Sequence, residues 1–159
     1  MPNWIEGTMK LRGKREDIRR FFLEGLDPSS WLTTGDIKHQ VEDNSTEYSL
    51  DFTFRDQPHI VDTRRAFITD DYAYMDEDYG IICVNIKQAW CFCEAYGSED
   101  MQVWKTISEK YDVDLRLFGI EMGQAFVQEL IIVRGKRPIL NEKQYEDWMW
   151  ECPFPMMGG

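Results

Sequence analysis

The chain has 159 residues, a formal net charge of −11 and 14% aromatic residues, which is the size of one domain with enough large side chains for a core. The excess of carboxylates disfavours direct binding to nucleic acid or to an anionic membrane, because both need a cationic protein surface. No apolar run approaches the length of a membrane span, and the first residues lack a signal-peptide pattern. We therefore expect a cytoplasmic protein that is not inserted in a membrane.

The beginning of the chain predicts a strand followed by a helix. Residues 4–12 alternate between apolar and polar side chains, which is typical of a half-buried strand, and Gly13 supplies a turn. Apolar side chains then recur at helical spacing over residues 15–26, and Asp27-Pro28 ends this helix. Residues 27–45 have the composition of a loop.

The middle of the chain predicts a hairpin and an acidic loop. Residues 47–55 alternate strictly and predict an amphipathic strand, with Tyr48 on its apolar side. Residues 60–69 predict the second strand of this hairpin. Residues 70–80 predict a loop, because they hold five carboxylates and no base. We expect residues 27–79 to form one insertion that carries the hairpin and the acidic loop.

The second half predicts strands around one well-capped helix. Residues 80–93 form a long β-type run, and Ser98 is the expected N-cap of a helix over residues 99–111. Residues 113–120 and 125–133 predict a hairpin. Residues 140–150 predict a last helix that is rich in Trp, and the end of the chain, 156–159, is expected to fray.

Together these elements predict a single domain over residues 1–159 with an α+β fold. Without the insertion, the order of elements is that of a ferredoxin-like antiparallel sheet with two helices on one face. The helices over 15–26 and 99–111 would cover that face. The inserted hairpin and the C-terminal helix would be additions to this arrangement.

Short patterns in both halves of the chain resemble a known family. Near the N-terminus they are Pro2-Asn3-Trp4, Gly7-x-Met9-x-Leu11-x-Gly13 and the helix positions Ile18, Phe21 and Phe22. Further on they are Ala89-Trp90, the helix over 101–111 and Glu121-x-Gly123-x-x-Phe126. Over residues 2–26 and 80–135 the chain is thus similar to the YubB-type ferredoxin-like proteins of phages and mobile elements.

The resemblance implies an α+β fold and a phage-type origin, and it implies no catalytic residue, because the family has no assigned activity. The chain departs from the family pattern after Trp90, where Cys-Phe-Cys-Glu stands in place of the expected prolines. Residues 27–79 have no counterpart in the family.

Carboxylates and tyrosines gather in the middle of the sequence. Carboxylates two positions apart on a strand lie about 6.6–7 Å apart, a spacing comparable to that of neighbouring phosphates along nucleic acid. Such an array can occupy a basic cleft, and interleaved tyrosines are typical interface side chains. The alternative is a solvated acidic loop. The predicted partner-binding residues are Glu47, Asp51, Asp70, Asp71, Tyr72, Tyr74, Asp76, Glu77, Asp78 and Tyr79.

These observations predict a small acidic phage-type accessory protein that binds and inhibits a host protein. The expected class is an anti-CRISPR or other anti-defence inhibitor that mimics nucleic acid. Its partner would be a nuclease or another nucleic-acid-handling complex with a basic cleft, in the cytoplasm of a bacterial host. The charge supports the binding mode, whereas the phage-type class comes only from the resemblance.

Two other functions stay open. A nucleotide- or nucleic-acid-binding module is the first, since a basic stretch accompanies the predicted sheet at Lys10, Arg12, Lys14, Arg15, Arg19 and Arg20. Acidic residues interrupt this stretch, and the chain holds no RNA-recognition motif. An enzyme is the second. The chain lacks the common hydrolase and nucleotide-binding motifs, but Cys91 or Cys93 with His39 or His59 is a candidate nucleophile and base.

No cofactor or metal is expected. The C-x-C spacing of Cys91 and Cys93 differs from the C-x2-C spacing of structural zinc sites. The acidic residues 70–78 do not have the register of a calcium-binding EF-hand loop. Aromatic and Met side chains gather near the C-terminus at Trp148, Trp150, Phe154, Met156 and Met157. The helical spacing of Tyr145, Trp148 and Met149 predicts core packing, whereas Trp150 and the tail predict a surface for a partner or for self-association.

Overall fold

A computed structural model describes residues 3–27, 41–76 and 80–157. Of the described residues, 43% lie in strands and 19% in helices. An eight-stranded antiparallel sheet, here the large sheet, accompanies a three-stranded antiparallel sheet, here the small sheet. The fold is therefore mostly β, and the predicted ferredoxin-like α+β fold is wrong.

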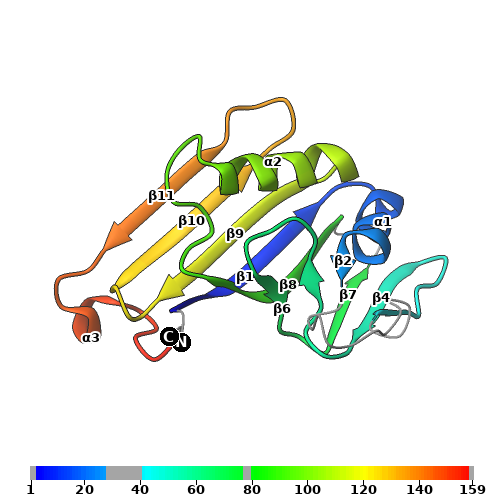
Figure 1. Cartoon of the computed structure of the whole chain (residues 1–159). Coiled ribbons are helices and arrows are strands. Elements are labelled where there is room, and N and C mark those ends of the chain that lie inside the picture. Colours follow the sequence, from blue (N-terminus) through cyan, green and yellow to red (C-terminus); the bar gives the residue numbers. More distant parts are fainter. Residues whose placement is uncertain (1–2, 28–40, 77–79, 158–159) are drawn as a thin grey trace.

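The large sheet collects strands from the whole length of the chain, in the order β11-β10-β9-β1-β8-β6-β5-β2 (Figure 1). The N-terminal strand lies near its middle and pairs with β8 on one side and β9 on the other. The strands are β1 (Trp4–Arg12), β2 (Leu26–Asp27), β5 (His59–Ile60), β6 (Ala66–Ile68), β8 (Ile81–Ala89), β9 (Asp114–Glu121), β10 (Phe126–Ile132) and β11 (Ile139–Gln144).

Strands β1 and β9, near the centre of the large sheet, approach each other closely at a pair of glycines. The buried face of β1 holds Ile5, Gly7, Met9 and Leu11, which confirms the strand predicted over residues 4–12. Gly7 stands opposite Gly119 of β9. A Cβ atom at Gly7 would lie 1.9 Å from the carbonyl oxygen of Phe118, so only glycine permits this approach of the two backbones.

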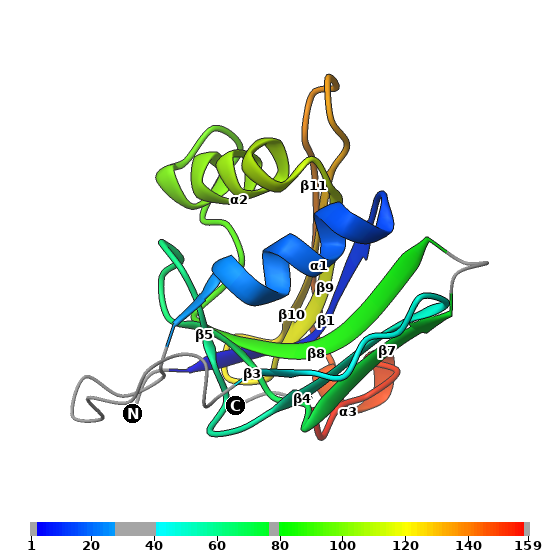
Figure 2. The same ribbon diagram turned by 90° about the vertical axis from the view of Figure 1, so that its right-hand side faces the viewer.

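Two of the three helices lie on one side of the large sheet (Figure 2). They are α1 (Arg15–Glu24) and α2 (Glu99–Tyr111), whereas α3 (Trp148–Glu151) is a single turn near the C-terminus. The Ser98 side chain accepts a hydrogen bond from the Met101 amide at the start of α2, as the sequence predicted. None of the described helices has the length and apolar character needed to span a membrane.

The predicted helix over residues 140–150 is wrong. Residues 139–144 form β11, which pairs with β10 from Phe126 to Ile131. Only Trp148–Glu151 is helical. The open edge of β10 supplies backbone partners to this segment, and such a tertiary contact outweighs the helical spacing of a few apolar side chains.

The small sheet has the order β3-β4-β7, with β3 at Val41–Asp43, β4 at Ser49–Phe54 and β7 at Tyr72–Asp76. Strand β4 therefore pairs with β7, so the predicted hairpin between residues 47–55 and 60–69 is wrong. Residues 59–60 and 66–68 join the large sheet instead. The predicted acidic loop is also wrong over residues 72–76, because Ala73 and Met75 are buried there opposite Phe52 and Leu50.

Helix α1 connects the two sheets through its aromatic face. Phe22 is fully buried, and its ring lies 4.8 Å from that of Phe52 and 5.5 Å from that of Phe54, both on β4. The neighbouring Phe21 contacts Tyr111 of α2 edge to face, with ring centroids 5.5 Å apart. One apolar cluster therefore extends from α2 through α1 to the small sheet.

We predict that Phe22→Ala lowers the free energy of unfolding by about 3–5 kcal/mol, because it removes a fully buried ring that packs against the small sheet. Urea unfolding followed by tryptophan fluorescence measures the loss. Leu23→Ala, one residue along the same helix at a position that is 36% exposed, should cost about 1 kcal/mol or less. Equal losses for the two variants would contradict this account of the core.

Candidate functional site

The outer face of the small sheet gathers four of the residues predicted to bind a partner. Tyr72, Tyr74 and Asp76 alternate on β7 with the buried Ala73 and Met75. In the β4–β7 ladder Asp51 stands opposite Tyr74, and Asp76 stands opposite Ser49. We call this surface the acidic tyrosine face, formed by Glu42, Asp51, Tyr72, Tyr74 and Asp76.

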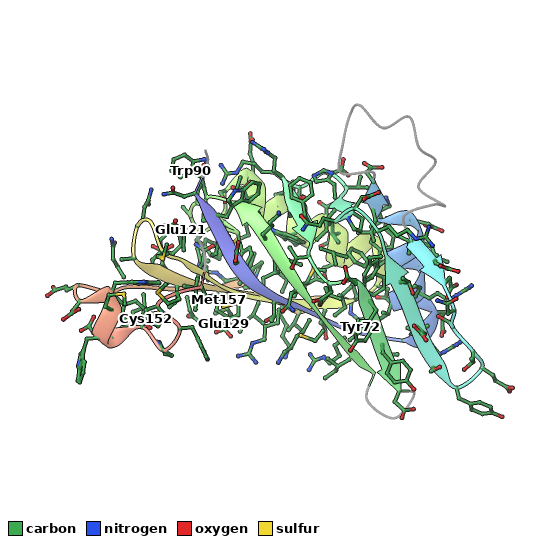
Figure 3. The ribbon with its side chains drawn as sticks, turned by 90° about the horizontal axis from the view of Figure 1, so that it is seen from below. Tyr72, Trp90, Glu121, Glu129, Cys152 and Met157 are labelled. Atoms are coloured by element: carbon green, nitrogen blue, oxygen red, sulfur yellow. The ribbon has the colours of Figure 1, made fainter. Side chains whose placement is uncertain are left out.

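The tyrosines of this face are unusually open to solvent. Tyr72 is 67% exposed and Tyr74 is 54% exposed, and Figure 3 shows Tyr72 on the opposite side of the molecule from Cys152. A strand fixes the spacing and direction of its side chains, so the two rings stand on a rigid support. Such rings bury much area for little loss of conformational entropy.

Other predicted residues lie beside this face or outside it. The carboxylate of Asp70 accepts hydrogen bonds from the backbone amide of Asn85 at 2.6 Å and from its side-chain amide at 2.7 Å. Asp70 therefore attaches the chain to β8, and its role in partner binding stays a prediction. Asp71 is exposed just before β7. The remaining predicted residues, Glu77, Asp78 and Tyr79, lie outside the described residues.

The turn between β3 and β4 adds Glu47 and Tyr48 to the rim of the face. Side chains hold this turn: the Asp43 carboxylate accepts from the Ser45 amide at 3.0 Å, and the Ser45 hydroxyl accepts from the Asp51 amide at 3.1 Å. Tyr48 is 67% exposed, which corrects the prediction that it faces the core. It precedes the first residue of β4, so the alternation of the strand does not extend to it.

The charge around the face is strongly negative. Residues 41–58 and 69–76 hold one cation, Arg55, and the eight carboxylates Glu42, Asp43, Glu47, Asp51, Asp56, Asp70, Asp71 and Asp76. Arg55 lies 3.6 Å from Glu42 in an exposed ion pair, which contributes little energy. The face therefore presents a negative potential to a partner.

Basic residues of α1 hold the small sheet from behind. A terminal guanidinium nitrogen of Arg15 donates hydrogen bonds to the carbonyl oxygens of Thr46 and Ser49, and Arg19 Nε donates to Asp43 at 2.8 Å. Arg20 donates to the carbonyl oxygen of Lys110. The basic stretch predicted as one nucleic-acid surface is thus divided, because its helical part is used for packing.

The C-x-C segment borders a polar pocket of about 320 Å³ that the sequence did not indicate. Trp90 at its rim is 49% exposed and has a φ of 71°, a strained value for a bulky side chain. The guanidinium of Arg64 forms two ion pairs, from Nη1 to Glu94 Oε1 at 2.6 Å and from Nη2 to Asp100 Oδ2 at 3.0 Å. Burial raises the pKa of Cys91 to about 11 despite the nearby Arg64 guanidinium. Cys91 is therefore a neutral thiol at physiological pH.

The described histidine does not join the cysteines. His59 Nε2 lies 3.2 Å from the carbonyl oxygen of Thr63, and its ring contacts Phe67. His39 lies outside the described residues. Within residues 3–27, 41–76 and 80–157, no group of three or more His, Cys, Asp or Glu side chains could hold a metal ion.

The aromatic and Met residues near the C-terminus divide into a packed set and an exposed set. Cys152 is buried against Ile120 and Tyr145, and Trp148 donates a hydrogen bond to the carbonyl oxygen of Pro155 at 2.8 Å. Trp150 is 87% exposed and Met156 is 81% exposed. Self-association through these exposed side chains stays a prediction.

No family model, curated protein or solved structure matches this chain significantly. The similarity to the YubB-type proteins therefore rests on the short sequence patterns alone.

We predict that Asp43 stabilises the protein above its ordinary pKa of 3.8 and that this contribution falls in acid. Burial opposes its ionisation, but hydrogen bonds from Ser45 and the Arg19 guanidinium outweigh burial and hold the pKa lower. The stabilisation is complete above the unfolded-state pKa and is lost as the pH falls through the lower folded-state pKa. Urea unfolding between about pH 6 and about pH 2.5 tests this.

The difference in unfolding free energy between the parent and Asp43→Asn should therefore shrink as the pH falls. Glu146→Gln, at an exposed position, should keep the pH dependence of the parent. A difference between parent and Asp43→Asn that stays constant across this range would contradict the assignment.

We predict that Cys91 reacts slowly with iodoacetamide, because a thiol with a pKa of about 11 is roughly 0.1% thiolate at about pH 8. Mass spectrometry of the Cys91 peptide follows the reaction, with the urea-unfolded chain as the control. The folded protein should react at least about tenfold more slowly at this site. Equal rates in the two states would contradict the raised pKa of Cys91, and a faster rate in the folded state would show an activated thiol.

Proposed function

We propose that this protein works by binding a basic protein partner through the acidic tyrosine face. The observation that carries the proposal is the pairing of Asp51 with Tyr74 across the β4–β7 ladder, with Tyr72 and Asp76 in line on β7. Two open aromatic rings thus lie among carboxylates on one rigid surface.

The composition of this face matches that of a binding surface more closely than that of a solvated strand. An exposed tyrosine adds little to the hydrophobic core of its own protein. Tyrosines are, however, enriched among the interface residues that dominate binding energy. The surrounding carboxylates would speed the encounter with a cationic partner and disfavour acidic ones. The hydrogen-bonded turn at Asp43 and Ser45 keeps the rim in place before binding, which lowers the entropic cost of association.

The class of partner follows from the sign of the charge and from the family resemblance. A nuclease or other nucleic-acid-handling protein carries a cationic cleft for phosphates, and an acidic face complements such a cleft. The phage-type resemblance implies an origin and no activity, and on that origin we further propose that the bound protein is a host defence factor in a bacterial cytoplasm and that binding inhibits it. Inhibition of an anti-defence type is therefore the activity that we propose.

The binding step is tested with a variant that neutralises two carboxylates of the acidic tyrosine face. The control has the same net charge as this variant but keeps the face intact. Asp51→Asn with Asp76→Asn neutralises two carboxylates of the face, and Glu109→Gln with Glu146→Gln neutralises two exposed carboxylates elsewhere. Immobilised proteins are incubated with nuclease-treated bacterial lysate. We expect a protein that parent and control retain at equal stoichiometry and that the face variant retains at least about tenfold less.

Tyr72→Ala with Tyr74→Ala should reduce retention of the same protein by a similar factor, mainly through faster dissociation. Each variant should keep a Tm close to that of the parent, since Tyr72, Tyr74 and Asp76 are exposed and Asp51→Asn preserves the size of a half-buried side chain. Equal retention by the face variants and the parent would refute the proposed surface.

The inhibitory step has its own readout. The protein is expressed in bacteria that carry an active CRISPR system, and the plating of a targeted phage is counted. We expect the parent and the charge-matched control to raise plating, whereas the Asp51→Asn, Asp76→Asn variant leaves plating low. If the parent leaves plating unchanged although it retains a protein partner, the anti-defence class is wrong for this system.

A further inference from the structure

Among the described residues, the face of the large sheet that points away from α1 and α2 is uncovered over its central strands. Figure 3 views this side, with Glu129 on it. The C-terminal segment covers only one end, where Tyr145 and Cys152 bury Ile120. We call the uncovered centre the open face, formed by Thr8, Lys10 and Arg12 of β1, Ile81 of β8, Arg116 and Phe118 of β9, and Glu129 of β10.

Two hollows adjoin on the open face and share two cationic side chains. One hollow of about 200 Å³ is lined by Lys10, Arg116 and Phe118 together with Thr8 and Glu129. The other, of about 330 Å³, is lined by Lys10 and Arg116 again and by Arg12, Ile81, Asp114, Leu115, Ile131 and Val133. Lys10 and Arg116 therefore stand at the junction of a continuous depression.

These two cations face each other in the sheet register. Lys10 of β1 lies directly opposite Arg116 of β9, and like charges in this position destabilise a sheet. Arg116 Nε donates to Glu129 at 2.7 Å, which positions its guanidinium. Lys10 has no ion-pair partner among the described residues. Lys10 thus costs stability without an ion pair in return, as is common at binding sites.

The local balance of charge is positive although the whole chain is acidic. Arg12 and Arg134 both bind Asp114, at 2.7 Å and 3.0 Å. Arg134 also pairs with Asp112 at 2.8 Å. Among the described residues, the four cations Lys10, Arg12, Arg116 and Arg134 thus lie with three paired carboxylates, Asp112, Asp114 and Glu129, and Lys10 is the cation that has no ion pair. Exposed charges are screened beyond about 8 Å at physiological ionic strength, so the sign near the depression decides which ligand it attracts.

Phe118 adds a flat apolar surface beside the cations. It is 40% exposed on β9, across from Thr8. An exposed aromatic ring on a central strand, flanked by Lys and Arg, matches the way sheet surfaces stack bases and hold phosphates. We infer that the open face binds single-stranded nucleic acid, with a base against Phe118 and the adjoining phosphates at Lys10 and Arg116.

This inference goes beyond the proposed function and is independent of it. The open face and the acidic tyrosine face belong to different sheets and share no residue. The first attracts an anionic strand, whereas the second attracts a basic protein. Loss of one activity should therefore leave the other intact.

The probe is a fluorescein-labelled oligothymidylate of about 12 nucleotides, and its anisotropy is measured in about 50 mM NaCl. We expect saturable binding by the parent that weakens with added salt. Lys10→Glu should weaken binding at least about tenfold, and Phe118→Ala at least about fivefold. Lys136→Glu makes the same charge change at an exposed position between β10 and β11 and should stay within about twofold of the parent.

A further variant separates the site from the fold. Lys10→Thr removes the like-charge pair with Arg116, so it should raise the Tm while binding to the oligothymidylate falls by the same order as for Lys10→Glu. A lower Tm together with weaker binding would show that Lys10 supports the fold and would overturn its assignment as a ligand contact.

Three results would overturn the inference. The first is the absence of binding by the parent at about 100 µM protein in about 50 mM NaCl. The second is equal weakening by Lys136→Glu and Lys10→Glu, which would indicate a diffuse charge effect. The third is equal competition by a duplex of the same sequence or by thymidine monophosphate at the same phosphate concentration, which would exclude stacking of a single strand. The Asp51→Asn, Asp76→Asn variant should bind like the parent.

Discussion

The packing of Phe22 against Phe52 and Phe54 is the contact on which the arrangement of the two sheets depends. The small sheet has three short strands, which are marginal without an apolar face to pack on. Helix α1 supplies that face, while its other aromatic residue, Phe21, contacts α2 above the large sheet. One turn of helix therefore fixes where the outer surface of the small sheet lies relative to the rest of the molecule.

Helix α1 also places basic side chains on the inner side of the small sheet, away from its acidic outer side. Arg15 and Arg19 point to the small sheet from its inner side and bind the turn at Thr46 and the carboxylate of Asp43. The outer side of that sheet keeps its carboxylates with Arg55 as the one cation within residues 41–58 and 69–76. A net charge of −11 is thus distributed unevenly, with an acidic face on one sheet and a basic centre on the other. The two surfaces call for partners of opposite charge.

Several parts of the candidate site follow from local pattern, and others do not. Asp51, Tyr72 and Tyr74 were predicted as contact residues from composition, and the ladder places them side by side. Asp70 looked equivalent in the sequence, yet its carboxylate holds Asn85 of the large sheet. Lys10 and Arg116 lie more than a hundred positions apart, so only the β1–β9 pairing reveals that they face each other.

The sequence by itself determined the elements whose signals are local. Alternation of apolar and polar side chains defined β1, and the Ser98 cap with its apolar stripe defined α2 at its observed bounds. The tertiary structure decided which strands pair, because the partner of a strand is set by contacts distant along the chain. Residues 139–144 became β11 since β10 offered an open edge, and residues 72–76 became β7 since Leu50 and Phe52 covered Ala73 and Met75. The local preferences that helical spacing and acidic composition indicate are weaker than the free energies of burial and strand pairing. Those free energies depend on residues distant along the chain, so a short stretch of sequence does not reveal them.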